Sequence, residues 1–106
     1  MDVEIHPEAE DELNTLPASE RNAMLNALAK LEAIGSTLDY PHTSQVKGAT
    51  ALRELRPRAG KSPWRAFYRQ VGSVLRVVAI GPDAEIKPRL FRAAVKRATQ
   101  RLEDPG

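Results

Sequence analysis

Apolar residues recur at helical spacing through the first third of the chain. Those of a first helix are Ala9, Leu13 and Leu16, and those of a second are Met24, Leu28, Leu31 and Ile34. Pro7 suits the first position of a helix, and Pro17 separates the two segments. Gly35 suits the C-terminal end of the second helix. The pattern predicts a helical hairpin over residues 7–35, with a short strand ahead of it at Asp2–Ile5.

The period changes to two after residue 51. Three segments rich in β-branched and aromatic residues predict strands, at Leu52–Arg58, Trp64–Val71 and Val74–Ile80. Gly72-Ser73 predicts a two-residue hairpin turn, and residues 36–51 predict a long loop. Helical spacing returns over Lys87–Leu102. The expected fold is α+β: an N-terminal helical hairpin packed on a small antiparallel β-sheet with a C-terminal helix, in one domain of 106 residues.

The two-residue turn also predicts which side chains share a face of the sheet, because it pairs the residues that flank it. One face is almost entirely apolar and should contact the helices: Trp64, Ala66, Tyr68, Leu75, Val77 and Ala79. The opposite face carries Arg65, Phe67, Arg69, Arg76, Val78 and Ile80. Leu55 should point to the core. Its neighbours Glu54, Arg56 and Arg58 then join the second face, which we expect to be open to solvent.

Arg69 faces Arg76 in this register. Like charges directly opposite each other destabilise a sheet by up to about 1 kcal/mol. A bound anion such as a phosphate would offset the repulsion, and so would Glu54 or water around splayed side chains. A phosphate site and a solvated basic face both fit the sequence.

The net charge of +2 is unevenly distributed. Residues 1–35 contain two basic and eight acidic residues, whereas residues 44–80 contain eight basic residues and a single acid. The acidic start disfavours a DNA-reading helix-turn-helix, and the basic middle favours a polyanion or an acidic protein as partner. The chain has no cysteine, no apolar run of membrane-spanning length and no N-terminal export signal. We therefore expect a cytoplasmic protein.

Few other residues offer chemistry. His42 is a candidate general base, Lys47 could reach a phosphate, and Glu54 could act as a general base or form a salt bridge with neighbouring arginines. The two histidines are too few and too far apart to indicate a metal site. The sequence has neither a Gly-rich phosphate loop nor a nucleophile motif.

Three motifs occur in order before the last helix. They are Leu52-Arg53-Glu54-Leu55-Arg56, Trp64-Arg65-Ala66-Phe67-Tyr68-Arg69 and Val74-Leu75-Arg76-Val77-Val78-Ala79. Together they resemble the RelE/HigB group of toxins from type II toxin–antitoxin systems, most closely its phage-derived HigB-like branch. The resemblance covers about residues 2–102.

The resemblance implies a toxin that binds messenger RNA on a concave sheet face, usually within the ribosome, and cleaves it without a metal. It also implies an acidic antitoxin as partner and no cofactor. In such cleavage the ribose 2′-OH attacks the adjacent phosphate, and arginines stabilise the negative charge. The candidate catalytic residues are Arg56, Arg65 and Glu54, and the candidate RNA-binding residues are Lys47, Arg58, Arg69 and Arg76. Arg56 and Arg65 match basic residues of the family, whereas Arg69 and Arg76 follow from the register alone.

The chain departs from this family in two places. Glu54 occupies a position that often holds lysine, and Pro82-Asp83-Ala84-Glu85 replaces a basic residue followed by an aromatic or histidine proton donor. Only Tyr40, His42 or Lys47 is left as a general acid. Two other functions therefore stay open: a ParE-like inhibitor of DNA gyrase, and a non-catalytic binder of RNA or protein.

Overall fold

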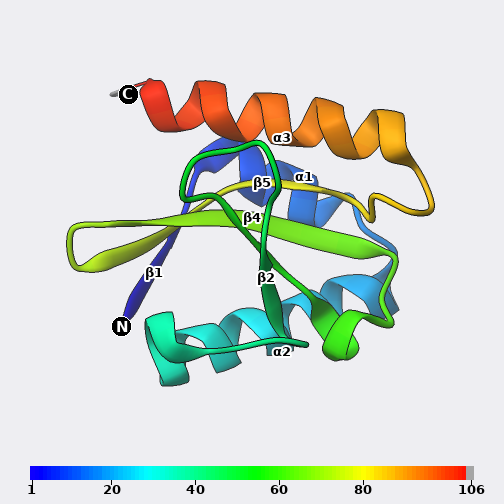
Figure 1. The fold of residues 1–106 in the computed structure, drawn as a ribbon. Helices are drawn as coiled ribbons and strands as arrows, with labels where there is room; N and C mark the ends of the chain where they lie inside the picture. Colours follow the sequence, from blue (N-terminus) through cyan, green and yellow to red (C-terminus); the bar gives the residue numbers. More distant parts are fainter. Residues whose placement is uncertain (105–106) are drawn as a thin grey trace.

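A five-stranded sheet forms the centre of the molecule, with helices on both faces (Figure 1). The computed structural model describes residues 1–104. The strands lie in the order β1 (Asp2–Ile5), β5 (Val74–Pro82), β4 (Trp64–Val71), β3 (Arg53–Leu55) and β2 (Thr43–Gln45). β1 runs parallel to β5, and the other neighbours are antiparallel. The α+β prediction is confirmed, and no helix in the described residues is long and apolar enough to cross a membrane.

The predicted helical hairpin is present as α1 (Pro7–Asn14) and α2 (Ala18–Ile34). Pro7 begins α1, and Gly35 ends α2 with a φ of 80°, which glycine adopts without steric cost. A short 3₁₀ helix, η1 (Gly35–Thr37), follows. The apolar sides of both helices pack on one face of the sheet, around Leu13, Met24, Leu31, Leu55, Tyr68, Leu75 and Val77.

The β4–β5 hairpin confirms the first four predicted pairs, counted from the turn. Beyond them β5 contains one extra residue, Val78, so Phe67 pairs with Ala79. This bulge exchanges the faces of the two residues that follow it: Ala79 joins the core on the α3 side, and Ile80 joins the core on the hairpin side. The predicted faces of Ala79 and Ile80 were therefore wrong.

The C-terminal helix α3 (Pro88–Glu103) covers the face that was predicted to be open. Phe91 packs edge-to-face on Phe67 with ring centres 5.4 Å apart, and Ala94 lies so close over Gly81 that no Cβ would fit there. The loop between β2 and β3 reaches the same helix (Figure 1) and adds Val46 and Leu52 to this second core. The open-face prediction was wrong because this helix and loop bury the middle of the face.

β3 is shorter than predicted because the chain turns sharply after it. Pro57 provides no backbone N–H for a ladder, and Arg58 and Ala59 have φ angles of 54° and 55°. These residues form the turn η2 (Pro57–Gly60). β2, in the predicted loop, was missed because its three polar residues show no apolar alternation.

Candidate functional site

Arg65 is the most buried residue of the predicted site. It lies on β4 on the α3 side, and only 2% of the residue is exposed. Its guanidinium donates hydrogen bonds to the carbonyls of Ser62 and Trp64, at 2.7 and 2.9 Å, and to that of Gly60 at 3.4 Å. The turn between β3 and β4 curls around this side chain. The expectation that Arg65 lies open to solvent was therefore wrong.

Two carboxylates face the Arg65 guanidinium. Asp83 Oδ2 lies 3.6 Å from Nη2, and Glu54 Oε1 lies 3.9 Å from Nε. Burial lowers the pKa of Arg65, and both carboxylates oppose this effect. Glu54 also accepts a hydrogen bond of 2.9 Å from the Ser44 hydroxyl on β2. The side chain of Glu54 is 15% exposed and that of Asp83 is 21% exposed, so neither carboxylate side chain is fully buried.

Glu54 thus forms the salt bridge that was one of its two predicted roles. Its other predicted role, as a general base, stays a prediction.

Arg56 lies under an exposed aromatic ring. Its guanidinium carbon is 5.0 Å from the centre of the Tyr40 ring, within the range of a cation–π interaction. Gly60 makes room for this guanidinium, because a Cβ at that position would lie 2.5 Å from Arg56 Nη2. Arg56 is also near enough for its charge to lower the pKa of Arg65.

We call Glu54, Arg56, Arg65 and Asp83 the arginine–carboxylate cluster. It gathers residues from β3 and the position just after it, from β4 and from the segment after β5, and its formal charges cancel. The terminal N–H groups of Arg65 already bond to backbone carbonyls and pair with Asp83. Arg56 is therefore the cation better placed to bind a ligand. In residues 1–104, no three histidine or acidic side chains gather as metal ligands would.

The other predicted site residues lie elsewhere. Arg58 turns toward α2 and pairs with Glu20 at 2.9 Å. Arg69 does face Arg76 across the ladder as predicted, about 13 Å along the strand from Arg65. Lys47 is exposed in the loop after β2. Of the seven predicted residues, the structure therefore brings Glu54, Arg56 and Arg65 together and separates the rest.

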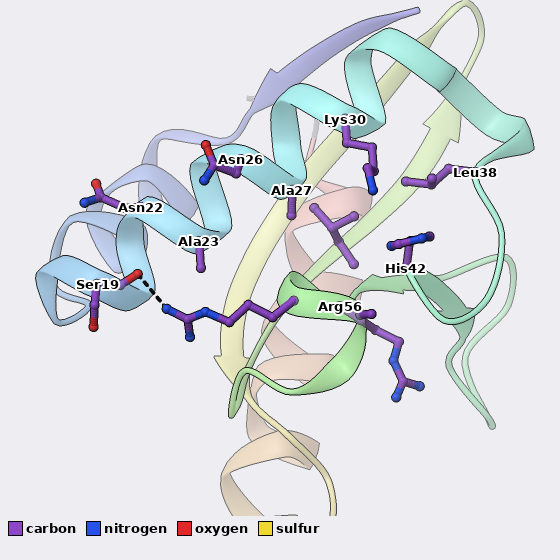
Figure 2. Close-up of a pocket in the computed structure, with 12 residues that line it drawn as sticks. Ser19, Asn22, Ala23, Asn26, Ala27, Lys30, Leu38, His42 and Arg56 are labelled. Atoms are coloured by element: carbon purple, nitrogen blue, oxygen red, sulfur yellow. Dashed lines mark hydrogen bonds between the residues drawn. The ribbon is translucent and has the colours of Figure 1, made fainter.

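A groove of about 640 Å³ runs between α2 and the β3–η2 segment, next to the cluster. In Figure 2, Ala23 and Ala27 face the groove from α2, and Lys30, Leu38 and His42 gather at one end. Arg56 lines the groove at its stem, and its guanidinium points away from α2 (Figure 2). The groove and the cluster therefore share one residue.

A second charged group, which the sequence analysis missed, joins the two helical layers. Glu12 of α1 accepts hydrogen bonds from Arg97 and Arg101 of α3, at 2.9–3.2 Å, and from the backbone N–H of Ile80 at 3.0 Å. Both arginines also donate to carbonyls of β5. Burial raises the pKa of Glu12, but the bonds from Arg101 and Ile80 and the two positive charges outweigh it, so the pKa is lowered.

Glu12 and its two arginine partners bond to the part of the β5 edge that lies beyond the short strand β1. The backbone N–H of His6 makes the last bond of that pairing, to Val77. Side chains then satisfy the next groups of the β5 edge, which would otherwise stay open to solvent or to another strand. The acidic run of α1 was the only signal in the sequence, and it did not distinguish Glu12 from its exposed neighbours.

Comparison with solved structures places this fold among the RelE toxins. An arginine-to-alanine double mutant of E. coli toxin RelE in the free state superposes with a TM-score of 0.62 at 19% identity, covering 91% of this chain and 95% of that one. The archaeal RelE–RelB complex from Pyrococcus horikoshii OT3 superposes with a TM-score of 0.55 at 20% identity, and the match covers 76% of this chain and 92% of that one. The intact E. coli RelBE toxin–antitoxin complex has a TM-score of 0.59 at 17% identity, and the match covers 77% of this chain and 95% of that one.

The chain thus has the fold of the RelE toxins. Residues 11–78 match the model of the phage-derived Gp49-like protein family, and the chain belongs to that family. No curated protein matches it by sequence. The resemblance inferred from the three motifs is confirmed at the level of the family and the fold.

Proposed function

We propose that this chain is the toxin of a type II toxin–antitoxin system and that it cleaves messenger RNA as an endoribonuclease. The fold that the chain shares with RelE toxins supports the toxin assignment. The arginine–carboxylate cluster supports the reaction, because a partly exposed carboxylate, Glu54, and a second guanidinium, Arg56, both lie near enough to Arg65 to influence its charge.

In the proposed reaction Glu54 accepts the proton of a ribose 2′-OH, whose oxygen attacks the adjacent phosphorus. Arg56 stabilises the negative charge that develops on the phosphate oxygens. The bond from phosphorus to the 5′ oxygen breaks, and that oxygen takes a proton from water. The hydroxide left behind takes the proton that Glu54 accepted, which restores the carboxylate. The products are a 2′,3′-cyclic phosphate and a 5′-hydroxyl end, so no redox partner or cofactor enters the balance.

Arg65 has a positioning role in this proposal. Its guanidinium is held by backbone carbonyls and faces both carboxylates, so it fixes where Glu54 and Asp83 lie. The predicted RNA contacts of Lys47, Arg58, Arg69 and Arg76 stay predictions, as does the catalytic role of the cluster.

The proposed partners are messenger RNA on the ribosome and a protein antitoxin, which places the action in the cytoplasm. Two of the similar structures are complexes of RelE with RelB. We expect the antitoxin of this chain to be acidic, because residues 44–80 carry a strong excess of positive charge.

One observation favours a second candidate, a relative that binds RNA or protein without cleaving it. The formal charges of the cluster cancel, and no histidine belongs to it. Such a site attracts the negative phosphate less strongly than a basic site does, and it offers no histidine to protonate the leaving oxygen.

Controlled expression followed by mapping of transcript ends tests the proposal. We expect the wild-type chain to arrest growth and to produce new 5′-hydroxyl ends, and Glu54→Gln and Arg56→Ala to abolish both effects. Arg92→Ala is the control, because Arg92 is an exposed arginine of α3 outside the cluster. Growth arrest without new RNA ends would overturn the endoribonuclease and support the second candidate, and a DNA-damage response would indicate gyrase as the target.

A further inference from the structure

Tyr40 is an exposed aromatic side chain on a braced loop. The residue is 67% exposed. Its backbone N–H donates to Asp39 Oδ1 at 2.7 Å, and the next turn is closed by a bond of 2.9 Å from the His42 N–H to the Asp39 carbonyl. The Arg56 N–H donates to the His42 carbonyl at 2.8 Å and joins this loop to the end of β3. Hydrogen bonds of the loop backbone therefore fix the position of Tyr40, whose side chain stays largely exposed to solvent.

A guanidinium backs the ring. The Arg56 guanidinium lies 5.0 Å from its centre, and Arg56 Nε is buried without a hydrogen-bond partner among the described residues. His42 and Lys30 line the neighbouring end of the groove (Figure 2). A single exposed aromatic residue is ordinary on a protein surface. One that is backed by a guanidinium, beside a groove end that carries a lysine, matches the composition of sites that bind single-stranded nucleic acid.

We propose that Tyr40, supported by Arg56, is a stacking platform for an unpaired RNA base. The proposal rests on the proposed function, because it names how the same site holds its substrate. Unpaired bases are bound by stacking on aromatic rings and on guanidinium planes, and adjacent cations meet the backbone phosphates. Arg56 contributes to both, since it contacts the Tyr40 ring and belongs to the arginine–carboxylate cluster. Every base has a flat face, so the platform tolerates different sequences but requires a single strand.

Binding of an RNA that cannot be cleaved tests the platform separately from the reaction. The probe is a dye-labelled single-stranded RNA whose 2′-hydroxyls are methylated, which removes the nucleophile, and the readout is fluorescence anisotropy at low salt. We expect Tyr40→Leu to weaken binding by about 5- to 150-fold, the range for loss of one stacked base. Tyr40→Phe keeps the ring and should bind within about twofold of the wild type. Leu90→Ala, at an exposed apolar residue of α3, is the control and should have no effect.

A blunt-ended RNA duplex of the same sequence completes the design. Its bases are already stacked, so Tyr40→Leu should leave its binding unchanged. Equal weakening for duplex and single strand would overturn the platform, and so would unchanged single-strand binding by Tyr40→Leu. A variant that binds RNA normally but loses only its antitoxin would assign Tyr40 to a protein interface and also overturn it. If the wild type cleaves RNA while Tyr40→Leu behaves like it, the platform fails and the proposed function stands; if the wild type neither binds nor cleaves RNA, the proposed function itself fails.

Discussion

Replacing Glu12 by glutamine removes the negative charge that Arg97 and Arg101 share while keeping an oxygen that can accept from the Ile80 N–H. A hydrogen bond to a charged group is worth about 1.5–3 kcal/mol when partly buried. The Glu12 and Arg101 side chains are 24% and 11% exposed, so solvent screens their pair only in part. Arg101 keeps Glu8, at 3.0 Å, and a carbonyl of β5 as partners. We therefore expect a loss of about 2 kcal/mol, which lowers the Tm of a domain of this size by roughly 10 °C.

The same substitution should flatten the dependence of stability on pH. The folded chain lowers the pKa of Glu12, so the ionised form stabilises the fold at pH values above the carboxyl's unfolded pKa. That contribution is lost as the pH falls through the lowered pKa of the folded state, from about pH 5 downward. Glu12→Gln lacks the titrating group, so its stability should fall less over this range than that of the wild type.

Urea unfolding followed by circular dichroism at pH 7 and at steps down to pH 3 measures both effects. Glu10→Gln is the matched control, because it is an exposed glutamate on the same helix and should change stability by less than about 0.5 kcal/mol. The reasoning is refuted if both variants lose the same stability at pH 7, or if Glu12→Gln follows the wild-type acid profile.

Three further predictions concern packing and charge. Gly60→Ala should cost about 1–3 kcal/mol and weaken RNA binding, because it strains a φ of 93° and displaces Arg56; Gly48→Ala, with similar strain and open space around it, should leave RNA binding unchanged. Gly81→Ala should lower the free energy of unfolding by about 1–3 kcal/mol by pushing Ala94 and α3 off the sheet, and an unchanged unfolding curve would contradict this packing. RNA affinity should fall with salt by a slope of about −0.7 for each phosphate neutralised, and Arg56→Ala should reduce the slope by about that amount; a salt-independent affinity would contradict phosphate contact.

The fold followed from local patterns wherever those patterns were complete. The helical spacing and the flanking prolines placed the hairpin of α1 and α2 within a few residues, and Gly72-Ser73 placed the β4–β5 turn and its first four pairs. Other features depended on contacts distant in sequence. The parallel pairing of β1 with β5 and the strand β2 have no signature in their own residues.

The site was harder to predict because alternation along a strand assigns a side chain to a face and does not show what covers that face. Glu54 and Arg65 do share a face, as predicted. The turn after β3 wraps the Arg65 side chain, and α3 covers neighbouring residues of the same face, which no spacing of charged residues reveals. The sequence showed Asp83 only as part of a segment that departs from the family, and the structure pairs it with Arg65.

The extra residue in β5 has a consequence for how relatives of this chain should be aligned. Because of Val78, Arg65 lies opposite Gly81, and the Asp83 N–H bonds to the carbonyl of Pro63 at 2.8 Å. A homologue of the same length that paired these strands without the bulge would place its arginine opposite the residue before this glycine. Its acid would move by one position along the ladder and turn to the other side of the sheet. Its arginine would then lose a neutralising neighbour and present a more positive surface. The pairing of β5, together with the identity of the charged residue that follows it, therefore decides whether such a site is neutral or basic.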